Sequence, residues 1–296
     1  MHPFQRAQRA ALSVLRTALA LAILLLTPAA GAEVRTGTLR VSFIDVGQGD
    51  AALLQDDAGC NILIDGGAPS KGSAVAAYLR AHGVHRLDAM VATHADSDHY
   101  GGLTAVLTAT DISTTQVLYN GIRAISSTTW MAFEQAVVSK GLTLTVAGQP
   151  ATYQWCATTA QTLNPDPSLS YSDDNDASVV FLVRHGRSRY LFTGDLPTSA
   201  ETAMLARADS GSWPVDVLKV AHHGSKYATS AAFLATAMPK VAVISVGPNP
   251  YGHPTVETLD RLAAAGALVY RTDLSGTIVL SASITYSHTL YLPAVR

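Results

Sequence analysis

One stretch of the sequence decides the fold: Thr93-His94-Ala95-Asp96-Ser97-Asp98-His99-Tyr100-Gly101-Gly102-Leu103. It holds two histidines and two aspartates within six residues, and imidazole nitrogen and carboxylate oxygen are ligands of zinc, iron and manganese. The two glycines that follow let the backbone fold tightly before a helix begins. A polar loop with an aspartate as helix N-cap is the alternative, but this density of ligand-type side chains favours a metal site. The expected metal ligands in this stretch are His94, Asp96, Asp98 and His99.

Two more segments with ligand-type side chains follow apolar, strand-like stretches. Asp195 comes shortly after 189–192, and His222-His223 follows 215–220. Loops at strand ends carry sites on a rigid scaffold, so we expect both segments to meet the first cluster at one edge of a sheet. Because a carboxylate has two oxygens, Asp195 could bridge two ions about 3.5–4 Å apart, or it could only cap the next helix. His222 is the preferred ligand of the pair and His223 the preferred contact to the substrate or to a ligand, but these roles could be exchanged.

The rest of the chain alternates strand and helix patterns, with no internal repeat and no linker. Apolar–polar alternation and short apolar runs predict strands at 39–46, 51–54, 61–64, 87–92, 178–183, 189–192, 215–220, 241–246, 268–271 and 277–283. Helical spacing and helix-stop signals predict helices at 73–80, 128–140, 200–208, 230–237 and 255–265. This order predicts an α/β (α+β) fold in which sheets pack face to face with helices outside.

The first 32 residues have the pattern of a secretory leader. Three arginines precede the apolar run 18–26, which is too short to span a bilayer, and Ala30-Gly31-Ala32 fits a small-residue cleavage site. An uncleaved amino-terminal anchor is the alternative. We expect residues 1–32 to be a signal peptide and residues 33–296 to be one exported domain, periplasmic or secreted, with no stable membrane association after cleavage.

Charge and cysteine content narrow the possible functions. The formal net charge is −2, and removal of the three leader arginines, with no acidic residue among them, would make it −5. A mildly acidic protein is not a general clamp for phosphate backbones, although a nuclease that contacts few phosphates stays open. Cys60 and Cys156 could form one disulfide outside the cytoplasm or remain buried free thiols.

A series of motifs along the chain resembles the metallo-β-lactamase superfamily. Besides 93–103, the motifs are Phe-Ile-Asp-Val-Gly-Gln-Gly-Asp-Ala at 43–51, Ile-Asp-Gly-Gly at 64–67, Phe-Thr-Gly-Asp at 192–195 and Val-Ala-His-His-Gly-Ser at 220–225. Within that superfamily they are similar to the soluble hydrolase domain of ComEC-type competence proteins. The resemblance extends over about residues 39–277. It implies a four-layer αββα sandwich with a two-metal site at one edge of the sheets.

The resemblance also assigns roles to particular residues. The superfamily's ligand positions fall on His94, Asp96, Asp98, His99, Asp195 and one of His222 and His223. Asp65 matches an acidic residue that supports the ligand loop and so orients the ligands. The implied cofactors are two divalent metal ions, Zn or Mn.

Two departures from the common superfamily pattern affect the expected metal. Histidine is usual where this chain has Asp96, and the ligand histidine usually found before the bridging aspartate is replaced by Asn175 in Asn175-Asp176-Ala177-Ser178. A site richer in oxygen ligands shifts the preference from zinc towards harder ions such as manganese. Asn175 could be a weak ligand or could only hold the loop, with Ser178 as a neighbouring contact.

Other polar side chains are expected near the metals or the substrate: Asp45, Gln48, Asp50, Lys219, Asn249 and His253. The first three occupy a glycine-rich turn that could lie against the metals or could only be a structured turn. Lys219 could neutralise a substrate phosphate or face solvent. The loop with Asn249 and His253 resembles the family's site-flanking segment, and His253 could contact substrate or transfer a proton.

Three functions follow from these residues. The first is a two-metal phosphodiesterase, and more narrowly a nuclease. In it a bridging hydroxide attacks phosphorus, and both metals offset the charge that develops on the phosphoryl oxygens. The expected catalytic residues are Asp98, Asp195 and His253. The second is hydrolysis of an ester, lactone or β-lactam, and the third is a non-catalytic exported metal-binding module. A phosphodiester or small molecule is the expected substrate and nucleic acid a candidate partner, whereas the sequence leaves the oligomeric state open.

Overall fold

The computed structural model describes residues 37–207 and 213–283. The expected signal peptide, residues 1–32, lies outside the described residues. Most of the described strands belong to two seven-stranded sheets. The first sheet has the order β16 (Ile278–Ser283), β1 (Thr38–Phe43), β2 (Ala52–Asp56), β3 (Asn61–Ile64), β5 (Ala89–Ala92), β7 (Val117–Tyr119) and β8 (Leu144–Val146). The second has the order β15 (Leu268–Arg271), β14 (Val241–Ile244), β13 (Val217–Lys219), β12 (Ser188–Phe192), β11 (Val180–His185), β10 (Thr158–Asn164) and β9 (Thr152–Trp155).

Side-chain alternation along the strands separates the apolar interior into layers. In β11, Phe181 and Val183 belong to the cluster between the sheets, whereas Val180 and Leu182 belong to the cluster on the outer face of the second sheet. Successive side chains of a strand point to opposite faces, so a strand that is buried on both faces reads as a continuous apolar run. Both sheets supply the inner cluster, and the rings of Phe43 and Phe192 stack across it with centroids 5.9 Å apart.

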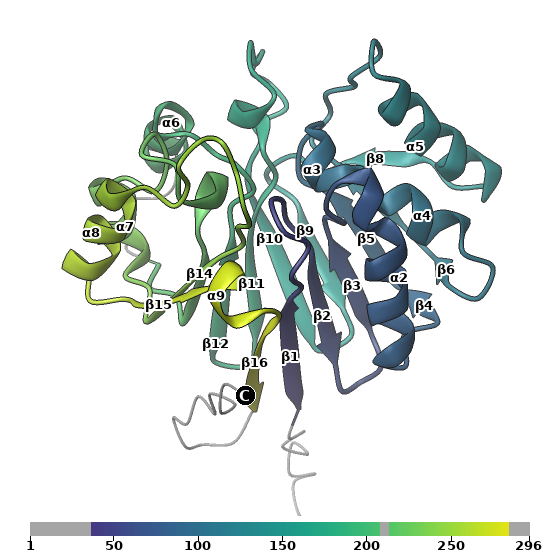
Figure 1. The fold of residues 1–296 in the computed structure, drawn as a ribbon, viewed down its shortest axis with the longest axis horizontal. Coiled ribbons are helices and arrows are strands. Elements are labelled where there is room, and N and C mark those ends of the chain that lie inside the picture. Colours follow the sequence, from purple (N-terminus) through teal and green to yellow (C-terminus); the bar gives the residue numbers. More distant parts are fainter. Residues whose placement is uncertain (1–36, 208–212, 284–296) are drawn as a thin grey trace, which may run out of the picture. The chain divides into compact units, whose positions relative to one another are not determined.

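Helices cover the outer face of each sheet. Helices α2 (Gly72–Ala81), α4 (Leu103–Thr108) and α5 (Thr128–Ser139) pack on the first sheet through side chains such as Leu79 and Trp130. Helices α6 (Thr198–Arg207), α7 (Ala231–Ala237) and α8 (Val256–Ala264) pack on the second sheet. The result is the αββα sandwich, so the expected fold class is confirmed (Figure 1).

The segment 144–164 differs from the sequence expectation, because it forms β8, β9 and β10 where no strand was predicted. In β10 alternate side chains are buried, but the buried positions include Thr158, Thr162 and Asn164. Polar residues at core-facing positions hide the alternation from a hydrophobicity pattern. The other expected elements are present with small shifts; α6 begins at Thr198, and the predicted end of that helix at residue 208 lies outside the described residues.

A disulfide joins the two sheets. Cys60, beside the β2–β3 turn, bonds to Cys156 in the β9–β10 turn, with the two Cα atoms 5.8 Å apart. Asp56 reinforces the same contact, since its carboxylate accepts hydrogen bonds from the Ala157 amide (3.0 Å) and the Thr158 hydroxyl (2.8 Å). The structure thus decides between the two states of the cysteines that the sequence left open.

None of the helices within 37–207 and 213–283 combines the length and the apolar character that a membrane span requires.

Candidate metal centre

Strand ends bring the ligand-type segments together. His94 follows β5 of the first sheet, whereas Asp195 and His223 follow β12 and β13 of the second. Backbone hydrogen bonds connect these segments, from Val179 N to Thr93 O (2.8 Å) and from His222 N to Gly194 O (3.2 Å). The expectation that distant segments meet at one edge of the sheets agrees with this geometry.

The closest group of nitrogen and oxygen atoms forms around Asp195. Its Oδ1 lies 3.2 Å from His99 Nε2, and its Oδ2 lies 3.3 Å from His223 Nε2. His223 Nε2 is also 3.3 Å from His99 Nε2 and 3.4 Å from Asp98 Oδ2. Four side chains from three segments therefore direct ligand atoms at one small volume.

A second group adds His94 to His99 and Asp195. His94, His99 and Asp195 each offer an atom within 4.8 Å of the others, and the His94 and His99 rings are 4.1 Å apart at their centroids. Asp96 borders this group, with its Oδ2 3.6 Å from His94 Nε2. Asp195 is common to both groups, which is the position that a bridging carboxylate requires.

Unpartnered atoms show that this donor set fits cations. His94 Nε2 is buried without a hydrogen-bond partner, and the buried Asp195 Oδ1 has only its contact with His99 Nε2 at 3.2 Å. A buried acceptor without a partner costs about 1–3 kcal/mol, and such atoms are rare in native structures. Imidazole and carboxylate donors of this kind suit Zn or Mn. The residues present therefore fit two divalent ions.

Asp65 orients the ligand loop. Its carboxylate accepts hydrogen bonds from the Thr93 amide (2.8 Å) and the Thr93 hydroxyl (2.7 Å), and its Oδ2 is 3.0 Å from His99 Nδ1. A carboxylate at Nδ1 fixes the ring so that Nε2 faces the centre. This arrangement suits the supporting role that the family resemblance implies for Asp65.

Glycine allows the ligand loop to approach the Asp65 loop closely. A Cβ at Gly102 would lie 2.0 Å from the Gly66 carbonyl oxygen, a distance that no side chain tolerates. The glycines after the ligand cluster are therefore needed for packing as well as for a tight turn.

Asp50 and Lys219 form a buried ion pair behind the histidines. Asp50 Oδ1 lies 3.4 Å from His223 Nδ1, and Asp50 Oδ2 lies 3.7 Å from His99 Nδ1. Burial by itself raises the pKa of Asp50, but Lys219 and then the two histidines outweigh it and lower the pKa. Lys219 is only 3% exposed and pairs with Asp50, so the alternative that it faces solvent is wrong.

The geometry favours the exchanged assignment of the histidine pair. The His223 side chain is 2% exposed and its Nδ1 donates to the Ser245 carbonyl (2.9 Å), which leaves Nε2 facing Asp195. The His222 side chain is 34% exposed, with Nε2 3.9 Å from Asp195 Oδ2. Both residues have left-handed backbone, with φ of 49° and 52°, a strained conformation that occurs preferentially at functional sites. That turn, which the sequence pattern does not reveal, decides which ring faces inward.

The histidines and carboxylates of the centre stabilise each other's charged forms. Burial lowers the pKa of His99 and His223, but Asp195 together with Asp50 and the other neighbouring carboxylates outweighs it and raises both pKa values well above the ordinary value. Burial in turn raises the pKa of Asp195 and Asp98, but His223 and His99 bring both pKa values below the ordinary value. The surrounding carboxylates therefore favour positive charge at the position of the two ring Nε2 atoms.

The loop before β11 contributes one residue that the sequence reasoning missed. The Asp174 carboxylate accepts hydrogen bonds from the Ala95 amide and from Asn120 Nδ2, the latter at 2.8 Å, and burial raises its pKa. It therefore holds the turn between His94 and Asp96. Asp174 lies in the acidic run 173–176, and nothing in the sequence distinguishes it from its neighbours.

The same loop contains two further expected residues, Asn175 and Ser178. Asn175 Oδ1 is buried without a hydrogen-bond partner, as a weak oxygen ligand would be. Ser178 Oγ accepts a hydrogen bond from the Asp195 amide (3.2 Å), so it positions the bridging carboxylate through its backbone.

The remaining expected residues surround a pocket beside the centre. Asp45, Asn249 and His253 line this pocket, and Gln48 Oε1 accepts from the Gly247 amide (3.5 Å). The His253 ring lies 5.6 Å from the His222 ring, and burial lowers its pKa. None of these side chains belongs to the two groups around Asp195.

This fold and this donor set define a class of protein. A sequence model described as the Metallo-beta-lactamase superfamily matches residues 44–120 and 164–247, and the chain belongs to that superfamily. Crystal structures of two proteins share the fold. YhfI of Bacillus subtilis, a metallo-beta-lactamase fold protein, matches 81% of this chain and 98% of its own with a TM-score of 0.53 at 13% identity. CmlA of Streptomyces venezuelae, a diiron beta-hydroxylase, matches 83% of this chain and 54% of its own with a TM-score of 0.52 at 13% identity.

Within the superfamily, the similar curated proteins include competence proteins, as the motifs imply. Competence protein ComA of Neisseria gonorrhoeae is 33% identical over 80% of this chain and 31% of its own length. Recombination protein 2 of Haemophilus influenzae is 30% identical over 90% of this chain and 32% of its own length. ComE operon protein 3 of Bacillus subtilis is 30% identical over 80% of this chain and 32% of its own length. The chain therefore spans about a third of the length of these relatives.

Proposed function

We propose that this chain is an exported, two-metal-dependent phosphodiesterase, and more narrowly a nuclease. The observation that carries the proposal is the gathering of His94, Asp98, His99 and His223 around Asp195, with the buried His94 Nε2 left without a hydrogen-bond partner. The similarity to competence and recombination proteins supports a nucleic-acid substrate. The disulfide supports export, because such bonds persist in oxidising compartments.

Each donor group would hold one ion. Asp98, His99 and His223 would bind the first, His94 and Asp96 the second, with Asp195 between them. When bound, two divalent cations acidify water and act as a Lewis acid at phosphorus. The abundance of carboxylates in the set favours manganese over zinc.

The chain's own residues orient these donors and leave one side open to substrate. Asp65 and the Ser245 carbonyl fix the two inner rings through their Nδ1 atoms. The side chains of Asp98 and His222 are each 34% exposed, and that of Asp96 is 53% exposed. They mark the side from which a phosphodiester would reach the centre, where His222, with Nε2 3.9 Å from Asp195 Oδ2, would contact a phosphoryl oxygen.

Metal analysis combined with a substrate panel tests this proposal. Purified protein should bind close to two equivalents of Mn or Zn and should cleave bis(p-nitrophenyl) phosphate and single-stranded DNA. Asp195→Asn should abolish both cleavage reactions and lower metal binding. The matched control is Asp111→Asn, which removes the same charge from a partly exposed aspartate that pairs with Arg80, and it should keep full activity.

Two outcomes would contradict the proposal. Hydrolysis of a lactone, an ester or nitrocefin without phosphodiester cleavage would assign the centre to carbon esters or amides. Stoichiometric metal binding without turnover of any substrate would assign the chain to metal binding alone.

A further inference from the structure

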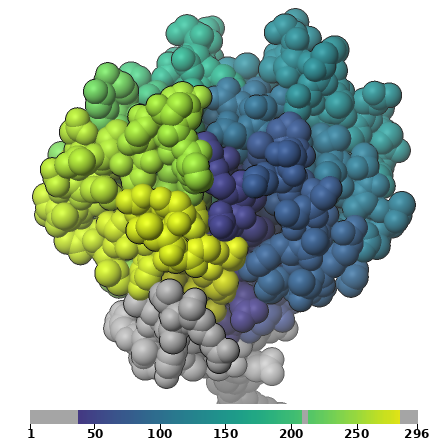
Figure 2. Space-filling model, in the orientation of Figure 1, coloured from purple at the N-terminus to yellow at the C-terminus, as the bar shows by residue number. Residues whose placement is uncertain are grey.

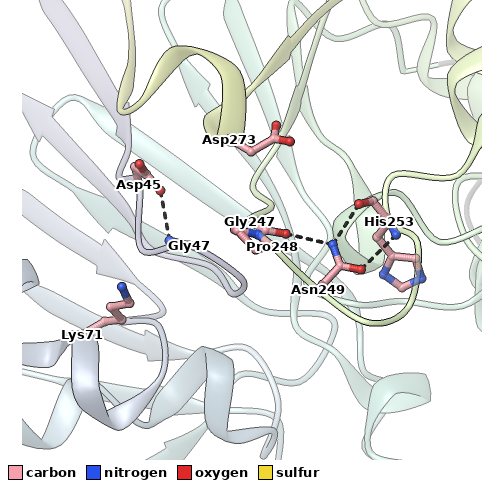
Figure 3. A pocket seen from close by; sticks show the side chains of 8 residues that line it. All are labelled: Asp45, Gly47, Lys71, Gly247, Pro248, Asn249, His253 and Asp273. Atoms are coloured by element: carbon pink, nitrogen blue, oxygen red, sulfur yellow. Dashed lines mark hydrogen bonds between the residues drawn. The ribbon is translucent and has the colours of Figure 1, made fainter.

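A pocket of about 550 Å³ adjoins the candidate metal centre. Asp45, Gly47 and Lys71 line it from one side, and Gly247, Pro248, Asn249, His253 and Asp273 line it from the other (Figure 3). Its volume lies within the range of about 300–1,000 Å³ typical of ligand sites. The pocket therefore joins N-terminal and C-terminal parts of the fold, which meet on the face shown in Figure 2.

One aromatic ring separates the pocket from the centre. His253 lines the pocket, and its ring centroid is 5.6 Å from that of His222. His222 Nε2 is in turn 3.9 Å from Asp195 Oδ2. A substrate group bound in the pocket would thus lie a short distance from a phosphodiester bound at the metal centre.

The wall that carries His253 is held rigidly. The Asn249 side-chain amide donates hydrogen bonds to the Gly247 and His253 carbonyls, both at 2.8 Å. Its oxygen accepts hydrogen bonds from the Tyr251 and His253 backbone amides at 3.1 and 3.0 Å. Figure 3 shows the bonds to Gly247 and His253. The Thr255 amide also donates to the Gly224 carbonyl (3.0 Å), which ties the loop to the histidine turn. A loop fixed in this way loses little conformational entropy when a ligand binds.

An exposed tyrosine stands on this rigid loop. Tyr251 is 69% exposed, and its ring centroid is 5.6 Å from that of His253. An exposed aromatic ring on a fixed backbone offers a flat face to a planar ligand, and a nucleobase stacked on such a ring gains about 1–3 kcal/mol.

The opposite wall carries an unpaired cation. In the part of the chain that the structure describes, the Lys71 ammonium makes no ion pair or hydrogen bond; it lies 3.8 Å from the place of a Cβ on Gly47. By contrast, Asp273 is neutralised by Arg271 at 2.6 Å, and the Asp45 carboxylate accepts from the Gly47 amide at 3.0 Å. Lys71 is therefore available to a phosphate.

We propose that the pocket is a nucleotide subsite for single-stranded nucleic acid. The base next to the phosphate at the metal centre stacks on the Tyr251 and His253 rings, and Lys71 contacts the adjoining phosphate. This inference rests on the proposed phosphodiesterase function and assigns its substrate class. Single strands are selected because an unpaired base can be splayed out and stacked. Stacking also supplies affinity that an acidic protein cannot obtain from many phosphate contacts.

Binding measurements on the uncleaving Asp195→Asn protein test the subsite. Fluorescence anisotropy compares a labelled oligothymidylate with an abasic strand of equal length, both in the presence of Mn. Tyr251→Ala should weaken binding of the oligothymidylate by roughly 5- to 150-fold, which corresponds to about 1–3 kcal/mol of stacking, and should leave the abasic strand unchanged. Tyr251→Phe should retain binding because it keeps the ring. Lys71→Gln should weaken the binding of both oligonucleotides equally. It should also reduce the slope of log K against log salt concentration by about 0.7.

A spectroscopic signal and a matched tyrosine complete the test. Fluorescence of a 2-aminopurine placed in the strand should be quenched on binding, and Tyr251→Ala should remove the quenching. Tyr227→Ala is the control, because Tyr227 is 68% exposed but its ring pairs with Lys226, whereas the Tyr251 ring pairs with the pocket residue His253; it should change neither signal. The proposed subsite would be rejected if Tyr251→Ala lowered the affinity for the oligothymidylate and the abasic strand equally. It would also be rejected if Tyr227→Ala lowered the affinity for the oligothymidylate as much as Tyr251→Ala.

The two proposals fail in different ways. Cleavage of bis(p-nitrophenyl) phosphate without base-dependent strand binding would retain the phosphodiesterase and reject the subsite. Base-dependent binding without cleavage of any phosphodiester would reject the phosphodiesterase and leave a nucleic-acid-binding pocket.

Discussion

Replacement of Cys60 and Cys156 together by alanine should lower the free energy of unfolding by up to about 4.7 kcal/mol. The bond closes a loop with a sequence separation of 96 residues, and the chain-entropy relation then gives about 15.7 cal/mol/K, or about 4.7 kcal/mol at room temperature. For a domain of this size, each kcal/mol shifts Tm by about 2–4 °C, so Tm should fall by roughly 9–19 °C. Urea unfolding followed by fluorescence measures the change, and reductant should reproduce it in the wild-type protein but not in the double variant.

Function at ambient temperature should survive the loss of this bond. The Asp56 hydrogen bonds to Ala157 and Thr158 hold the same turns together, and neither cysteine lies in the two donor groups around Asp195. Equal urea midpoints for the oxidised wild type and the double variant would refute the reasoning. So would two free thiols titrated in denaturant from the purified wild-type protein.

Two further predictions concern groups behind the metal centre. Lys219→Met should destabilise the fold by roughly 3–5 kcal/mol, because it removes the ammonium group that pairs with the buried Asp50 carboxylate. Lys219→Met combined with Asp50→Asn should recover part of that loss in urea unfolding, and an unchanged midpoint in the single variant would contradict the pairing. Asp174→Ala should lower metal affinity about 10- to 100-fold, because it releases the Ala95 amide within the ligand loop. Competition with a chromophoric chelator measures that affinity, with Asp111→Ala as the control; equal affinities for both variants would show that Asp174 does not position the ligands.

Much of the architecture could be predicted because its signals are local. Local hydrophobic patterns predicted strands such as 61–64 and 189–192. Ligand-type residues followed three of the predicted strands. Since strand ends gather at sheet edges, the meeting of His94, Asp195 and the histidine pair followed from short-range patterns. The strand β10 escaped prediction because polar residues occupy its buried positions, and β8 and β9 are short strands with almost no buried residue.

The sequence by itself determined the fold class, most of the strands and helices in their order along the chain, and the clusters from which ligands come, because hydrophobic period and residue spacing are properties of neighbouring residues. Only the tertiary structure decided that His223 faces inward, that Lys219 pairs with Asp50, and that Cys60 bonds to Cys156. Each of these depends on backbone geometry or on contacts between segments far apart in the chain. A one-dimensional pattern specifies which residues share a face, but packing in three dimensions selects which partners those residues meet.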